Sequence, residues 1–140
     1  MPAPKCPFQQ PLITEDLACH LAQAVTVRNA PQIHCRSEQA LTLCQTVYAH
    51  LKAVGLPAFG MADDLASTPH SVYIKIQCGG LLGLQALGGI RPDREGTIAD
   101  IHTLIQAATR AGSDPDAPDY QKLLPFMQAH QSRRRRGRER

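Results

Sequence analysis

The chain has 140 residues, of which 43% are hydrophobic, 19% charged and only 4% aromatic. This length suits one domain, the apolar content argues against global disorder, and no apolar run approaches the roughly 18–20 residues of a membrane-spanning helix. The net charge of +3 comes from the last eight residues, which carry six arginines and one glutamate. The rest of the chain has a net charge of −2, so no basic DNA-binding face is expected on it.

The first residues predict an extended arm followed by a helix. Residues 1–13 contain four prolines, which remove backbone donors and restrict the residues before them. A first helix is predicted from Thr14, because threonine is a good N-cap and acidic residues follow it. Its apolar face would consist of Leu17, Leu21, Ala24 and Val25. The helix is expected to end at residues 28–31.

A second helix is predicted after Ser37, which can cap it, with Glu38 in the first turn. Its apolar stripe consists of Ala40, Leu41, Cys44, Val47, Tyr48 and Leu51. Gly55 and Pro57 are expected to end it, because both residues are typical of helix C-termini.

Residues 68–87 fit two structures. The alternation of apolar and polar residues over 72–78 is typical of a half-buried strand, whereas Thr68 before Pro69 resembles the start of a helix. A helix is preferred because no partner strand is evident, and a short strand at 72–78 is kept as the alternative. Gly79 and Gly80 each cost roughly 0.8–1 kcal/mol in a helix. Two arrangements would explain glycines at these positions: a cofactor bound at Gly79 and Gly80, or another helix that crosses close to the backbone.

Two further helices are predicted, at residues 97–111 and, disturbed by Pro125, at 120–130. The expected fold class is therefore mainly α, a small helical bundle of four to five helices. The expected organisation is an extended proline-rich arm (1–13), one helical domain (14–131) and a disordered arginine-rich tail (132–140).

Common catalytic motifs are not found in the sequence. The glycines match neither a phosphate-binding loop nor a dinucleotide fingerprint, and there is no paired-histidine zinc motif or serine elbow. The adjacent carboxylates of Asp63 and Asp64 point to opposite sides of any regular element. We therefore do not expect an enzyme in its own right.

The five cysteines carry the strongest chemical signal. Their number is odd and no signal peptide precedes them, so a cytoplasmic location with reduced thiols is expected. The intervals of 12, 15, 8 and 33 residues contain no Cys-x-x-Cys pair. Ligands can nevertheless converge from separate helices.

We predict a four-thiolate metal site. Cys19 points away from the apolar face of its predicted helix, which does not suit a core residue, and Cys35 lies in a predicted loop. A buried hydrophobic role for Cys44 remains the alternative. The predicted ligands are Cys19, Cys35, Cys44 and Cys78, with Cys6, His20 and His34 as substitutes.

The preferred cofactor is an iron–sulfur cluster, because thiolates suit it and the wide spacings lack the form of a zinc knuckle; zinc is the alternative. The predicted function is electron transfer or assistance to a larger redox enzyme, with a protein partner and no membrane. The alternative is a metal-free or zinc-stabilised interaction module. Its basic tail, Arg133–Arg140, would dock an acidic partner or nucleic acid, although a solvated tail is the simpler expectation.

Overall fold

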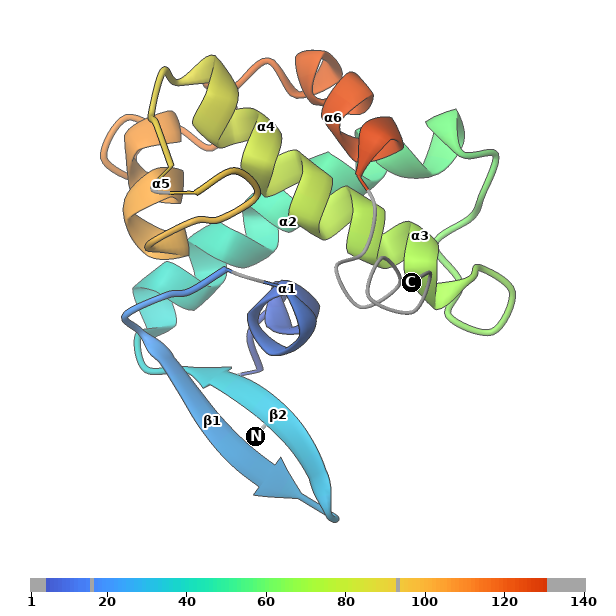
Figure 1. Ribbon diagram of the computed structural model, residues 1–140, viewed down its shortest axis with the longest axis vertical. Helices are drawn as coiled ribbons and strands as arrows, with labels where there is room; N and C mark the ends of the chain where they lie inside the picture. The colour runs from blue at the N-terminus through green and yellow to red at the C-terminus, as the bar shows by residue number, and fades with distance from the viewer. Residues whose placement is uncertain (1–4, 16, 93, 131–140) are drawn as a thin grey trace.

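The computed structural model describes residues 5–15, 17–92 and 94–130. Helices dominate these residues, and a two-stranded hairpin is their only sheet (Figure 1). The prediction of a mainly α fold is therefore confirmed. The elements in chain order are α1 (Gln9–Thr14), β1 (Ala22–Val27), β2 (Ala30–Cys35), α2 (Glu38–Ala58), α3 (His70–Ile74), η1 (Lys75–Gly79), α4 (Gly80–Leu87), α5 (Ile101–Ala108), η2 (Tyr120–Leu123) and α6 (Leu124–Ala129).

Helix α2 begins where the sequence predicts it. The Ser37 hydroxyl accepts a hydrogen bond from the backbone N–H of Ala40 (3.2 Å) and satisfies one of the free donors of the first turn. The helix continues past its predicted end, because Gly55 and Pro57 both lie inside its last turns. Its buried face carries Ala40, Cys44, Val47, Leu51, Gly55 and Leu56.

Residues 70–87 form one continuous helix, composed of α3, the π-helical turn η1 and α4. The alternative strand at residues 72–78 is therefore wrong. Both Ile76 and the neighbouring Gln77 are buried, because other elements cover the helix on more than one side. The apolar–polar alternation over residues 72–78 therefore does not follow burial here, because buried positions include both kinds of residue.

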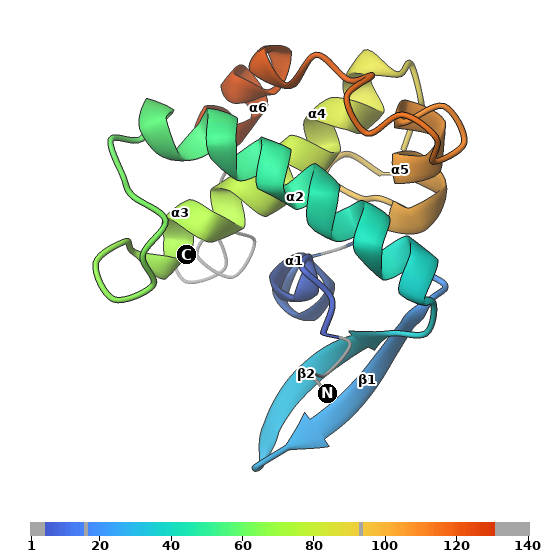
Figure 2. The same cartoon turned by 180° about the vertical axis from the view of Figure 1, so that it is seen from behind.

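Close helix crossings explain the glycines of this helix. A Cβ atom on Gly79 would lie 2.5 Å from Met127 Cα, and one on Gly80 would lie 2.9 Å from Leu51 Cδ2. Helix α6 and a side chain of α2 therefore fill the space in which a cofactor was expected beside Gly79 and Gly80. Seen from behind, α2 lies across this long helix (Figure 2).

The predicted helix beginning at Thr14 is wrong. Residues 22–27 form β1, which pairs antiparallel with β2 from Ala22↔Cys35 to Val27↔Ala30. The two turn residues, Arg28 and Asn29, have φ values of 51° and 63°, the left-handed conformation of a tight hairpin turn. Of the residues that suggested an apolar helix face, only Ala24 and Val25 lie in β1, which ends in the β-branched run Val25–Val27.

The prediction of an extended arm over residues 1–13 is wrong in part, because helix α1 begins at Gln9, within this proline-rich segment. Pro11 lies in the first turn of α1, where no intrahelical N–H donor is needed. Helix α1 lies between the hairpin and α2 (Figures 1 and 2). The predicted disordered tail lies outside the described residues.

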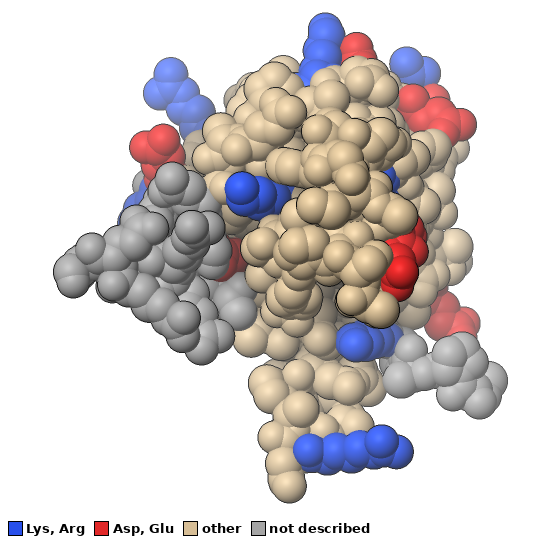
Figure 3. Space-filling view, turned by 90° about the vertical axis from the view of Figure 1, so that its right-hand side faces the viewer, with Lys and Arg blue, Asp and Glu red and all other residues tan. Residues whose placement is uncertain are grey.

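The C-terminal helices are shorter than predicted: α5 covers residues 101–108, and residues 120–129 divide into η2 and α6. Charged side chains of both signs are spread over the face shown in Figure 3, without a gathering of one sign. Within the described ranges, no helix combines the length and apolarity that crossing a bilayer requires.

Candidate metal centre

Four cysteines line one cavity, which we call the thiol cavity. Cys6 precedes α1, Cys19 lies between α1 and β1, Cys35 ends β2, and Cys44 lies in the second turn of α2. The cavity therefore draws its thiols from four separate segments, all within the first 44 residues. The other lining residues are Pro7, Leu21, Ala22, His34, Ala40, Leu41, Ile101 and His102.

Backbone pairing with β2 positions Cys6. The Cys6 N–H donates to the carbonyl of Ile33 (2.8 Å), one residue pair away from an isolated bridge between Lys5 and His34. The Ile33 N–H in turn donates to the side-chain oxygen of Gln9 in α1 (2.8 Å). These bonds hold the segment before α1 against the strand that ends at Cys35.

A second set of backbone bonds positions Cys19. The Ala18 N–H donates to the Ile98 carbonyl (3.0 Å), and the Ile101 N–H donates to the Ala18 carbonyl (2.8 Å). The Cys19 carbonyl accepts from the Ala22 N–H (3.0 Å) at the start of β1. The thiol is thereby held between the base of the hairpin and the start of α5.

Burial favours the protonated form of three thiols of the cavity, Cys6, Cys19 and Cys44. Burial raises the pKa of the Cys6 thiol to about 11, although a hydrogen bond from the Phe8 backbone opposes the shift. Burial also raises the pKa of Cys44, and the charges of Cys6, Cys19 and Cys35 would raise it further. Metal binding would displace their protons.

Backbone amides face two of the sulfurs. The pKa of the Cys19 thiol is raised by burial, while hydrogen bonds from the backbone of Leu21 and of His102 lower it. In both Cys6 and Cys19 one such amide belongs to the residue two positions later. Amide hydrogen bonds favour the thiolate and are known to tune metal-bound sulfur.

An acidic group lies beside the cavity. Asp100 accepts hydrogen bonds from the His20 N–H (2.9 Å) and from Thr103 (2.5 Å), and its carboxylate lies 2.7 Å from His20 Nδ1. Partial burial disfavours the carboxylate, but these bonds outweigh burial and lower the pKa of Asp100 to about 2. Ligand atoms of Cys19, His20 and Asp100 all lie within 4.8 Å of one another.

The structure brings three of the four predicted ligands together. Cys19, Cys35 and Cys44 share the thiol cavity, and the fourth position is taken by Cys6, which the sequence offers only as a substitute. Cys78 does not line this cavity; it lies in η1 beside Glu15 and His130. Of the substitute histidines, His34 lines the cavity.

His102 is the one ionisable residue of the cavity wall that sequence reasoning missed. Its ring lies 5.4 Å from that of His20, centroid to centroid. Nothing in the sequence places His102 there, since no local signal links the start of α5 to the hairpin. The bridge between Leu17 and Ile98 makes that link.

Four soft donors, hydrogen bonds to their sulfurs and a carboxylate nearby form a site that could hold a thiophilic metal or an iron–sulfur cluster. Comparison of the chain with protein-family models, with curated proteins and with solved structures finds no match.

Proposed function

We propose that this protein binds an iron–sulfur cluster through Cys6, Cys19, Cys35 and Cys44, and that it serves a larger redox enzyme in electron transfer or as an accessory protein. The supporting observation is that four thiols from four segments line one cavity. Four thiolates complete the ligand set of a common cluster. Reduced thiols of this kind suit the cytoplasm.

The spacing of the thiols favours a cluster over a single ion. Four Zn–S bonds of about 2.3 Å would hold the sulfurs about 3.8 Å apart. Among the described residues, two groups of three or more metal-binding side chains have their ligand atoms within 4.8 Å of one another, and neither contains more than one cysteine. A cluster lies between its thiolates and separates them further than one ion does.

A zinc-stabilised interaction module is the second candidate, and the narrowness of the cavity favours it. The enclosed space, about 10 Å³, accommodates the centre of about one water-sized sphere. A single ion needs no more room than this, and the thiols would move inward to bind it, whereas a cluster requires them to move outward.

Anaerobic purification followed by iron, sulfide and zinc analysis tests the proposal. We expect brown protein containing iron and acid-labile sulfide, and a loss of both in Cys19→Ser and Cys44→Ser. Cys78→Ser is the matched control, because it removes a buried thiol outside the cavity and should keep the iron and sulfide. Colourless protein with zinc bound by the same four thiols would select the second candidate. Folded protein that binds neither metal would reject both.

A further inference from the structure

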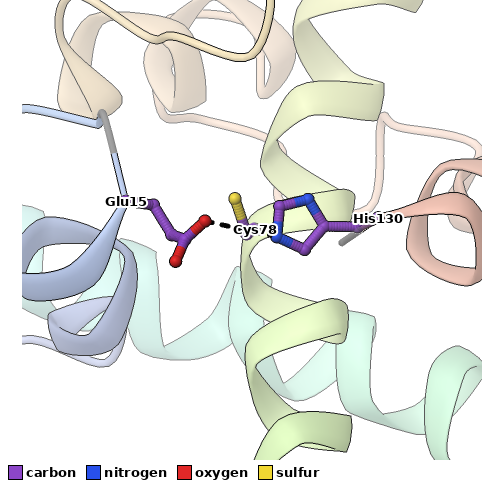
Figure 4. A group of neighbouring side chains, drawn as sticks. All are labelled: Glu15, Cys78 and His130. Atoms are coloured by element: carbon purple, nitrogen blue, oxygen red, sulfur yellow. Dashed lines mark ion pairs between the residues drawn. The ribbon is translucent and has the colours of Figure 1, made fainter. Parts of the chain in front are cut away.

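A second group of metal-binding side chains lies away from the thiol cavity, formed by Glu15, Cys78 and His130 (Figure 4). Their ligand atoms all lie within 4.8 Å of one another. Glu15 Oε1 and His130 Nε2 lie 3.6 Å apart and form an ion pair. Carboxylate, thiol and imidazole, the three donor types of protein zinc sites, thus converge on one point.

All three side chains are withdrawn from solvent. The exposed fraction is 3% for the Glu15 side chain and 9% for that of His130, and Cys78 is 1% exposed. Ionisable groups are seldom buried to this extent unless they are paired or bind a metal. Glu15 and His130 form an ion pair with each other, and a divalent cation bound by both and by Cys78 would keep their charges compensated in the same enclosed position.

Three distant parts of the chain build this group. Glu15 ends α1, with its N–H bonded to the Pro11 carbonyl (3.0 Å), and His130 ends α6, with its N–H bonded to the Phe126 carbonyl (3.1 Å). Cys78 lies between them, in the continuous helix of residues 70–87, which we call the central helix. The close approach of α6 at Gly79 brings the end of that helix over the thiol.

Local backbone geometry sets Cys78 apart. It is the fourth residue of the π-helical turn η1, between regular helix on both sides. Such turns are rare and are found frequently at functional sites. This observation is independent of the side-chain cluster and points to the same residue.

We propose that Glu15, Cys78 and His130 hold one zinc ion, at a site separate from the thiol cavity. Carboxylate, thiolate, neutral imidazole and Zn²⁺ sum to zero charge, which lowers the cost of burying them. Binding forms a Zn–S bond as the Cys78 proton leaves to solvent, with no change of oxidation state. Calcium and magnesium are disfavoured, because they prefer oxygen ligands throughout.

The ion would join α1, the central helix and α6, which lie far apart in the sequence. Zinc bound only by the folded state stabilises that state by mass action. Removal of zinc should therefore lower the melting temperature of the full chain without removing iron or sulfide from the thiol cavity.

Zinc titration of the full-length protein, with elemental analysis, tests the proposal. Wild type should retain one zinc equivalent more than Cys78→Ala after gel filtration, while iron and sulfide stay equal in the two. His70→Ala, which removes an exposed histidine, is the matched control and should keep the wild-type zinc content. Equal zinc content in wild type and Cys78→Ala would overturn the site.

Glu15→Gln keeps the test decisive if Cys78→Ala fails to fold, since it preserves side-chain shape and removes one charge. We expect its zinc dissociation constant to rise at least about tenfold. An unchanged constant would reject Glu15 as a ligand and with it the proposed site. The result is independent of the thiol cavity: loss of iron in Cys19→Ser concerns only the cluster, and loss of zinc in Cys78→Ala only this site.

Discussion

In the helical body, residues 38–129, the helices pack closely against one another. In the hairpin formed by β1 and β2, by contrast, no residue is buried. The buried core cluster of the described residues takes only Phe8 and Leu17 from the chain before α2. The hairpin region, residues 5–37, is held mainly by backbone hydrogen bonds, yet it supplies three of the four thiols of the cavity. Apolar packing thus holds the body, and the proposed metal would contribute most to the stability of the hairpin, which adds no residue to the buried core.

The largest effect is expected from Gly79→Ala in the body. The added Cβ would meet backbone atoms of Met127 at 2.5 Å, and a backbone cannot move aside as a side chain can. We expect a loss of about 3 kcal/mol in the free energy of unfolding, measured by urea denaturation. Gly80→Ala is the control, because its Cβ meets the flexible end of Leu51 and should cost less. Equal losses would contradict this account of the crossing.

The next effect concerns the hairpin region after metal removal. If the proposed metal binds, its removal by anaerobic chelation should speed amide hydrogen exchange in β1 and β2 at least about tenfold, because its bonds to Cys35 of the hairpin and to Cys44 of α2 are then lost. Amides in the middle of α2 should change much less, since apolar packing protects them. A uniform change across both regions, or no change in the hairpin, would remove the distinction between them.

A smaller effect is expected from pH in the metal-free protein. The folded-state pKa of Cys6 is raised from 9.0 to about 11 by burial, so the unfolded chain ionises first as pH rises. The stabilisation from keeping the thiol neutral is complete below pH 9 and is lost towards pH 11. Urea denaturation at pH 7 to 10.5 should show this fall, and Cys6→Ala together with Cys44→Ala should flatten it. An unchanged slope in that variant would assign the fall to other groups.

The smallest effect is expected at the hairpin turn. Asn29 has a φ of 63°, a conformation that glycine adopts without cost. Asn29→Gly should change the free energy of unfolding by no more than about 0.5 kcal/mol, whereas Asn29→Val should lower it by about 1–2 kcal/mol. Thermal denaturation of both variants measures the difference. Equal melting temperatures for the two would contradict the left-handed turn.

Sequence reasoning succeeded where local signals agreed with tertiary packing. Helix α2 has a cap at Ser37 and an apolar stripe, and both act as predicted. The central helix was also predicted as the preferred alternative, and the closeness of a neighbour at Gly79 and Gly80 was inferred from their cost. The neighbour proved to be protein, α6 and Leu51, which no local signal could distinguish from a cofactor.

The N-terminal region was harder, because two periodicities overlap in it. Leu17, Leu21, Ala24 and Val25 fit a helical face, and the same stretch contains a run of three β-branched residues, Val25–Val27, which favours a strand. The turn at Arg28 and Asn29 joins the two strands of the hairpin. Its asparagine is the residue of the sequence that could have indicated a turn there. Once a helix was assumed, Cys19 could be placed only on the wrong element, and the role of Cys6 beside β2 could not be seen.

The register of the hairpin has a consequence for the direction of Cys35. In a strand, successive side chains alternate between the two faces, so the pairing of Ala22 with Cys35 determines on which face the sulfur emerges. A slip of one residue would turn the thiol outward, whereas a slip of two would return it to the same face about 7 Å further along. A turn of two residues therefore directs the Cys35 thiol into the cavity. A turn of three residues would direct it outward and leave the proposed site with three thiols.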